Sequence, residues 1–70
     1  MMKNRLELKQ YLDDKTVYYV QNKKREKLGD IYFYKDWKKW IFESEIGIIF
    51  SDDCLLEIAG FVTIKNKQKG

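Results

Sequence analysis

The chain has 70 residues, enough for one small domain, and 14 Lys and Arg against 11 Asp and Glu give it a net charge of +3. It holds no histidine and a single cysteine, which excludes Ser-His and Cys-His catalytic pairs, internal disulfides and the commonest metal ligand. No apolar run approaches the roughly 20 residues of a membrane span, and the start MMKNRLELKQ lacks the apolar segment of a signal peptide. We therefore expect a cytoplasmic protein that is not an enzyme, has no metal or other cofactor, and has neither a membrane nor a small-molecule substrate as its partner.

The N-terminal arm, residues 1–15, has no single predicted conformation. Leu6 and Leu8 alternate as in a strand, whereas Leu8, Tyr11 and Leu12 repeat as on one face of a helix. A strand and a short helix therefore both remain open for this arm.

Residues 16–50 predict an antiparallel sheet. The run TVYYVQ at 16–21 is rich in β-branched and aromatic residues and predicts a strand, and the polar run NKKREK at 22–27 predicts a loop. Residues 28–42, LGDIYFYKDWKKWIF, hold two aromatic runs split by a polar pair, which is typical of a hairpin with a short turn. The apolar run IGIIF at 46–50 predicts one more short strand.

The two faces of this hairpin follow from the alternation of side chains along a strand. Because Lys39 and Glu43 favour water, we assign to the buried face Ile31, Phe33, Trp40 and Phe42. The outer face then carries Tyr32, Tyr34, Lys39 and Ile41.

Residues 52–64 predict an amphipathic helix with Ser51 as its N-cap. One apolar stripe at helical spacing is made by Leu55, Ile58, Ala59 and Val62, and Leu56 and Phe61 widen it. Gly60 lies within the helix, where glycine is unfavourable, so we expect close packing against the sheet there. Residues 65–70 are expected to form a frayed basic tail.

The predicted fold is therefore α+β and fills a single domain over residues 1–70. An antiparallel β-meander of three to four strands packs on one C-terminal α-helix in two layers, which leaves one face of the sheet without cover.

The charges are polarised along the chain. Residues 15–39 hold eight cations and three acids, whereas residues 40–64 hold five acids and no cation. Such a distribution could steer an encounter with a charged partner, and an ordinary solvated surface is the alternative interpretation.

Two binding functions are compatible with these features. The first is protein binding, either to another protein or to a second copy through the open sheet face, since aromatic residues are enriched at the centres of interfaces. Its candidate residues are Tyr18, Tyr32, Tyr34, Lys39 and Ile41.

The second function is nucleic-acid binding by a tyrosine-bearing sheet with a cationic surround. Its candidate residues are Lys23, Lys24, Arg25, Lys35, Lys38 and Lys39. Apart from the tail the chain is neutral, and it has no RNP-type, GXXG or helix-turn-helix pattern, so protein binding is the favoured hypothesis.

A resemblance to known proteins rests on LGDI at 28–31, WKKWIF at 37–42 and CLLEI at 54–58 followed by Phe61. This pattern resembles small uncharacterised proteins of bacterial prophages and mobile elements, which share an LG-x-I strand, a W-(R/K)-x-aromatic-x-F strand and a CL-x-(E/D)-I-x-x-F helix. The resemblance implies a phage-related protein of the bacterial cytoplasm with a sheet-plus-helix fold, and it supplies no catalytic residue. By analogy with small phage proteins that occlude host proteins, it suggests an inhibitor of a host defence protein. Phe33 departs from the pattern, which has Trp there.

Overall fold

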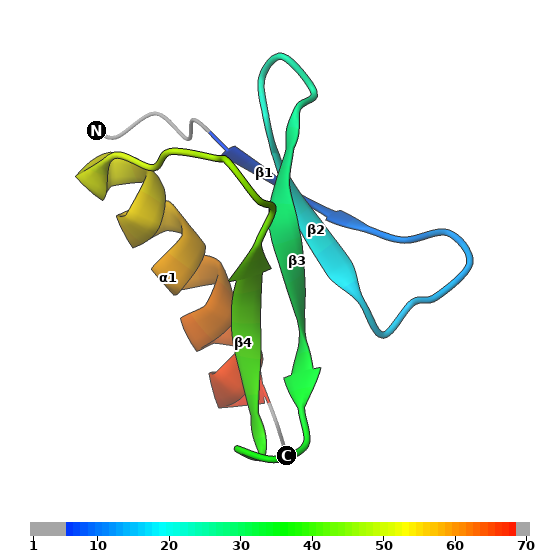
Figure 1. Cartoon of the computed structure of the whole chain (residues 1–70). Helices are drawn as coiled ribbons and strands as arrows, with labels where there is room; N and C mark the ends of the chain where they lie inside the picture. Colours follow the sequence, from blue (N-terminus) through cyan, green and yellow to red (C-terminus); the bar gives the residue numbers. More distant parts are fainter. Residues whose placement is uncertain (1–5, 69–70) are drawn as a thin grey trace.

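The computed structural model of the chain describes residues 6–68, and residues 1–5 and 69–70 lie outside the description. Within residues 6–68, four strands form one antiparallel sheet in the order β1-β2-β3-β4, and one helix follows them (Figure 1). The elements are β1 (Leu6–Gln10), β2 (Tyr18–Asn22), β3 (Lys27–Tyr34), β4 (Lys39–Ser44) and α1 (Asp52–Gln68). The predicted α+β fold, an antiparallel meander packed on a C-terminal helix, is confirmed.

Within the described part of the N-terminal arm, residues 6–10 form a strand and residues 11–15 a loop, so the structure has a strand and not a helix here. β1 pairs with β2, and the register places Leu8 opposite Val20. Leu6 is buried, and beyond the strand the Tyr11 N–H donates to the Val17 carbonyl across the β1–β2 loop. β1 therefore widens the sheet by one edge strand.

The prediction of a strand at 46–50 is wrong, because this segment forms the loop between β4 and α1. Gly47 has φ +83°, a left-handed backbone that interrupts an extended strand. Ile48 and Phe50 pack against the core, whereas Ile46 and Ile49 are exposed. Two side chains of this apolar run thus anchor the loop on the core, and the other two are exposed to solvent.

The core lies between the sheet and α1. Its buried members come from three strands and the helix: Leu6, Val20, Leu28, Ile31 and Ile58. Gly29 lets the Phe42 ring approach the sheet, since a Cβ at this position would lie 2.6 Å from that ring.

The assignment of the hairpin faces is confirmed by the register of β3 and β4. Ile31 lies opposite Phe42, and Phe33 lies opposite Trp40, so all four share the face turned to α1. Ile31 is fully buried and the two β4 rings are half-buried, but Phe33 is 40% exposed. Burial is therefore deepest at the middle of β3.

The helix begins where its cap predicts. The Ser51 carbonyl accepts from the Leu55 N–H (3.0 Å), and the Ser51 hydroxyl accepts from the Cys54 N–H (3.3 Å). The end differs, because α1 continues to Gln68 instead of fraying after residue 64. The rest of the predicted frayed tail, residues 69–70, lies outside the described residues.

The helix faces the sheet with a different stripe from the predicted one. Ile58 is buried and Val62 is half-buried, but Leu55 and Ala59 of the predicted stripe are exposed. The close packing expected at Gly60 is wrong, since a Cβ there would meet nothing within 4 Å. Of the two residues predicted to widen the stripe, Phe61 packs against the core as expected, whereas Leu56 is exposed.

Candidate functional site

The sheet face turned away from α1 gathers four of the five residues predicted for protein binding. The register places Tyr32 opposite Ile41 and Tyr34 opposite Lys39, so these four share the outer face. Tyr18 does not join them. It lies opposite Ile31, and its ring meets Trp40 edge-on with 6.1 Å between the ring centroids, which places it on the helix side.

Tyr19 and Tyr11 are outer-face residues that the sequence reasoning missed. Tyr19 alternates with the buried Val20, so the period of the strand was the available signal. Tyr11 follows β1, and its ring packs on Tyr19 with 4.9 Å between centroids. The sequence could not place Tyr11 on the outer face, because this placement depends on the pairing of β1 with β2.

Polar groups on the outer face are paired with one another. The Tyr11 hydroxyl donates to Asp30 (2.6 Å), and Lys27 forms ion pairs with Asp30 (3.1 Å) and Glu45 (3.2 Å). Partial burial of the ring, and then the bond to Asp30, raise the pKa of Tyr11. The Tyr32 hydroxyl donates to Glu43 (2.8 Å), and this bond raises the pKa of Tyr32. A partner covering this face would have to desolvate these paired groups.

The six cations predicted for nucleic-acid binding fall into two separate groups. Lys23, Lys24 and Arg25 lie in or beside the β2–β3 turn, and Lys35, Lys38 and Lys39 lie in or beside the β3–β4 turn. The two turns lie at opposite ends of β3 (Figure 1). At about 3.3 Å per strand residue, the eight residues of β3 hold the groups roughly 20 Å or more apart. The fold does not bring them together as one cationic surface.

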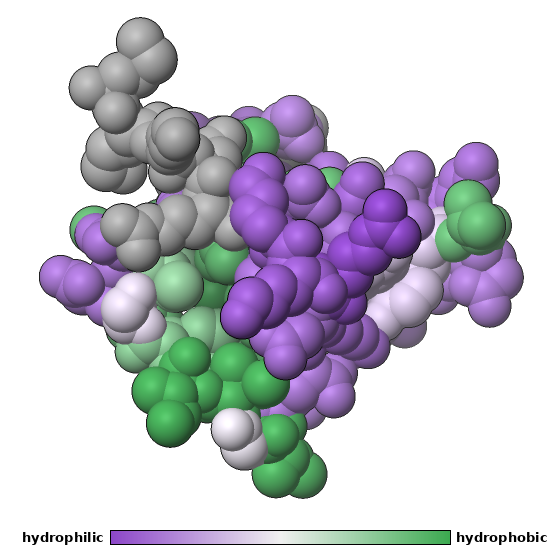
Figure 2. All heavy atoms as spheres, turned by 90° about the horizontal axis from the view of Figure 1, so that it is seen from above, coloured by the Kyte–Doolittle hydropathy of each residue, from purple (hydrophilic) through white to green (hydrophobic). Residues whose placement is uncertain are grey.

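An apolar patch occupies the β4–α1 loop and the start of α1. Its members are large aliphatic side chains with exposed fractions of 101% for Ile46, 94% for Ile49, 53% for Leu55 and 64% for Leu56. Figure 2, seen from this end of the molecule, shows hydrophobic atoms gathered on one side and a mainly hydrophilic surface beside them. Contiguous apolar surface of this kind marks contact sites more often than isolated exposed residues do.

The chain flanking the patch is acidic. Glu45 immediately precedes Ile46, and Asp52 and Asp53 form the first turn of α1, just before Leu55. No cation occurs in residues 40–64, which contain the whole patch. Glu45 is ion-paired with Lys27 (3.2 Å), so the patch is apolar at its centre and has its acidic side chains chiefly on the helix side, in the first turn of α1.

The patch continues into a groove between β4 and α1, which we call the β4–α1 groove. Its volume is about 440 Å³, and Leu55 belongs to both the patch and the groove. The walls are mostly apolar and include Trp37, Ile41, Phe42, Leu55, Ala59 and Val62. Lys39 and Asn66 supply polar groups at the groove. Two of the predicted site residues, Lys39 and Ile41, thus line a surface that the sequence did not reveal.

The edge of β4 beside this groove is tied to the helix at one residue. The Trp40 N–H donates to Asn66 Oδ1 (2.8 Å), and Asn66 Nδ2 donates to the Trp40 carbonyl (3.3 Å). The amide pairs with the strand edge as a neighbouring strand would. These two hydrogen bonds join α1 to the edge of β4 at Trp40, which lines the groove.

In residues 6–68, no group of three acidic or cysteine side chains is placed to hold a metal ion. The same residues contain no helix with the length and hydrophobicity needed to cross a bilayer.

Comparison with protein-family models, with curated proteins and with solved structures gives no match. The resemblance to prophage proteins therefore stays a prediction that rests on the quoted motifs.

Proposed function

We propose that the protein is a binding module without catalytic activity, and that it docks on another protein through the apolar patch and the β4–α1 groove. The observation that carries this proposal is that eight large apolar side chains within residues 6–68 are exposed, whereas only five apolar side chains are buried. Burying one Leu or Ile side chain contributes about 1.5–3 kcal/mol. Covering the patch would therefore supply free energy for association.

The patch and groove are favoured over the outer sheet face for a reason of solvation. The outer-face tyrosines Tyr11 and Tyr32 already donate to carboxylates, so covering them adds a cost of desolvation. The aliphatic side chains of the patch have no polar group to desolvate. Lys39 and Ile41 belong to both surfaces, since each is on the outer face and each lines the groove.

The acidic first turn of α1 beside the patch defines the partner's chemistry. We expect an apolar segment bordered by Lys or Arg, because opposite charges steer the encounter and fix its orientation. In the narrower form of the proposal the partner is a host protein of the bacterial cytoplasm, and binding inhibits a defence protein. Support for that form comes from the resemblance to prophage proteins and from the composition of the chain.

Capture from bacterial lysate with matched variants tests this proposal. Leu56→Lys puts a cation into the acidic-flanked patch, and Leu12→Lys makes the same change at a side chain that is 93% exposed in the β1–β2 loop. We expect the wild-type chain and the Leu12→Lys variant to retain the same protein, identified by mass spectrometry, and Leu56→Lys to lose it. Equal capture by all three chains, or capture of nucleic acid alone, contradicts the proposal.

A second copy of the chain is the other protein partner to consider, because residues 15–39 are as strongly basic as residues 40–64 are acidic. Sedimentation velocity of the purified chain over a range of concentrations separates the two cases. A dimer that Leu56→Lys disperses and Leu12→Lys leaves intact would identify the partner as a second copy. A dimer that only Tyr32→Ala disperses would instead use the outer sheet face.

A further inference from the structure

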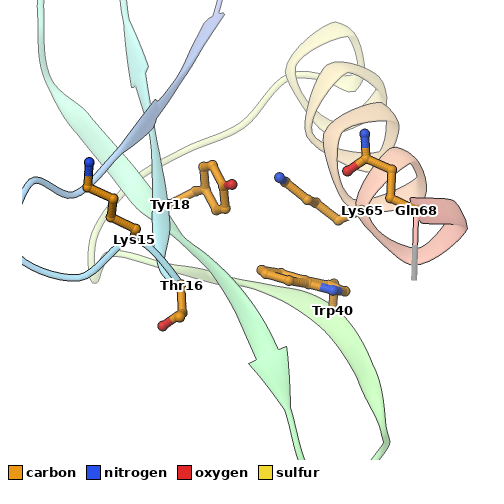
Figure 3. Close-up of a pocket in the computed structure, with 6 residues that line it drawn as sticks. All are labelled: Lys15, Thr16, Tyr18, Trp40, Lys65 and Gln68. Carbon is orange, nitrogen blue, oxygen red and sulfur yellow. The ribbon is translucent and has the colours of Figure 1, made fainter. Parts of the chain in front are cut away.

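A second cavity lies on the helix side of the sheet, at the end of α1 away from the patch. It is separate from the patch, and Trp40 lines both this cavity and the β4–α1 groove. Its volume is about 360 Å³, within the range of about 300–1,000 Å³ found for small-molecule sites. Figure 3 shows its lining residues, which come from the β1–β2 loop, β2, β4 and the last turns of α1. They are Lys15, Thr16, Tyr18, Trp40, Lys65 and Gln68.

Aromatic rings and an ammonium group meet inside this cavity. The Lys65 side chain reaches from α1 toward the Tyr18 ring, with Trp40 beside it (Figure 3). Its Nζ lies 3.8 Å from the centroid of Tyr18 and 5.6 Å from that of Trp40. Contact with the two rings stabilises the ammonium inside the cavity when no ligand is present. Trp40 is half-buried, so its indole is a fixed wall of the cavity.

The charge of the lining is positive only. Lys15 and Lys65 are its ionisable cations, and no carboxylate lines the cavity within the described residues. Lys65 has no ion pair with a carboxylate of residues 6–68, so its charge is available to a ligand. The C-terminal end of a helix carries about half a negative charge. Lys65 and Lys67 in the last turn outweigh that charge.

We infer that this cavity binds a nucleotide, with the base stacked on Trp40 and the phosphate held by Lys65, whose ammonium moves off the Trp40 ring to make room for the base. The Lys15 ammonium points away from Lys65 (Figure 3), so Lys15 adds positive charge at longer range. Stacking on an aromatic side chain suits any base, because every base has a π face. Lysine ammonium groups bind phosphate oxygens through charge-assisted hydrogen bonds. The nucleotide comes either from solution or from a single strand of nucleic acid, and both sources present the same base and phosphate.

Fluorescence titration of Trp40 tests the inference. The chain has two tryptophans, so Trp37→Phe leaves Trp40 as the single reporter. We expect AMP to quench this emission, adenosine to bind far more weakly, and Lys65→Met in the same background to weaken AMP binding by about tenfold or more. Lys9→Met, at an exposed residue of β1, is the matched control and should leave the affinity unchanged.

Further measurements distinguish a free nucleotide from a single strand of nucleic acid and provide a second variant. Tighter binding of a short single-stranded oligonucleotide than of AMP would assign the site to single strands, and the reverse order would assign it to free nucleotides. Circular dichroism checks that each variant folds. Should Lys65→Met fail to fold, Lys15→Met in the exposed loop replaces it, with a smaller loss expected. Three results would overturn the inference. They are the absence of quenching by both AMP and the oligonucleotide, equal affinity for AMP and adenosine, and unchanged AMP affinity in the lysine variants.

Discussion

At the scale of single residues, the two glycines Gly29 and Gly60 differ in whether the fold leaves room for a side chain. A Cβ at Gly29 would meet the Glu43 carbonyl and lie 2.6 Å from the Phe42 ring, whereas a Cβ at Gly60 would meet nothing within 4 Å. Only the first glycine is required by packing. This difference could not be predicted from the sequence, where Gly60 was the expected site of close packing.

Gly29→Ala is therefore predicted to lower the free energy of unfolding by about 1–3 kcal/mol, since β3 and β4 must move apart. Gly60→Ala is the matched control and should raise it by about 0.5–1 kcal/mol, because alanine favours the helix. Chemical denaturation of both variants measures the two values. Equal effects of the same sign would show that the Phe42 ring does not pack closely on Gly29.

A second prediction at this scale concerns alkaline pH. Partial burial and the bond to Asp30 raise the pKa of Tyr11, and hydrogen bonding to Tyr11, together with ion pairs to Asp30 and Glu45, raises the pKa of Lys27. Both groups hold their protons more tightly in the folded than in the unfolded state. Their contribution to stability is complete below about pH 10 and is lost as the pH rises through the folded-state pKa values.

Thermal unfolding followed by circular dichroism between about pH 9 and 11 checks this prediction. We expect the melting temperature of the wild-type chain to fall over this range, and to fall less steeply in Tyr11→Phe, which removes the hydroxyl. Tyr34→Phe is the control, since that tyrosine packs on Trp37 with 5.2 Å between ring centroids. The same slope in wild type and Tyr11→Phe would show that the Tyr11 hydroxyl does not cause the loss of stability.

At the scale of elements, the sequence predicts those features that depend on neighbours along the chain. Alternation in residues 31–42 indicated the two faces of the central hairpin, and Ser51 with the two acids after it indicated the start of α1. The apolar run at 46–50 was misassigned because a short apolar run is compatible with a strand and equally with a loop that anchors on the core.

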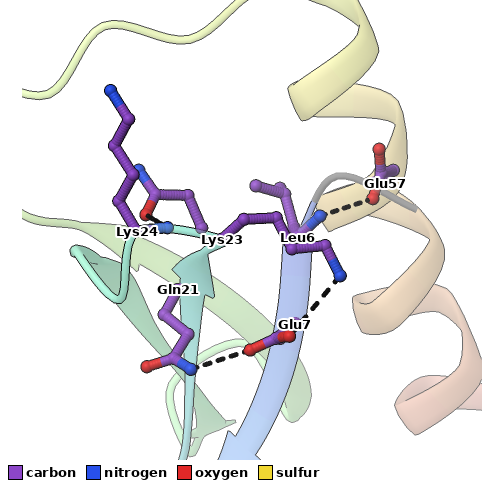
Figure 4. Close-up of polar contacts among 7 residues, drawn as sticks. Leu6, Glu7, Gln21, Lys23, Lys24 and Glu57 are labelled. Atoms are coloured by element: carbon purple, nitrogen blue, oxygen red, sulfur yellow. Dashed lines mark hydrogen bonds and ion pairs between the residues drawn. The ribbon is translucent and has the colours of Figure 1, made fainter. Parts of the chain in front are cut away.

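Contacts between distant elements could not be predicted in this way. Figure 4 shows how β1 is fixed: the Leu6 N–H donates to Glu57 of α1 (3.1 Å), and Gln21 donates to Glu7 (2.8 Å). Leu6 and Glu57 are 51 positions apart. Tertiary contacts therefore determine that the N-terminal arm forms a strand and not a helix. The β4–α1 groove likewise depends on how α1 packs against the sheet.

Asn66 is the residue that ties α1 to the edge of β4, and it carries the prediction at this scale. Asn66→Ala removes two hydrogen bonds to Trp40 and should lower the free energy of unfolding by about 1–3 kcal/mol. The neighbouring Lys67→Ala is the control, because that side chain is exposed and should change little. Comparable losses in both variants would mean that the amide contributes nothing specific to the junction.

At the scale of the whole molecule, the distribution of apolar side chains sets the properties of the protein. A chain of 70 residues buries only five apolar side chains within its described part, and it keeps a row of aliphatic side chains at the β4–α1 loop exposed. Domains of this size bury only about 60% of the surface that the unfolded chain exposes, less than larger domains do, and are marginally stable. Association through the exposed side chains would add the burial that the isolated chain lacks.

The most direct measurement is hydroxyl-radical footprinting of the wild-type chain, alone and bound to the protein that it captures. We predict protection of the patch residues Ile46, Ile49, Leu55 and Leu56 in the complex, with Leu12 oxidised equally in both states. Protection of Tyr32 and Tyr34 with an unprotected patch would contradict docking through the patch and move the docking surface to the outer face of the sheet.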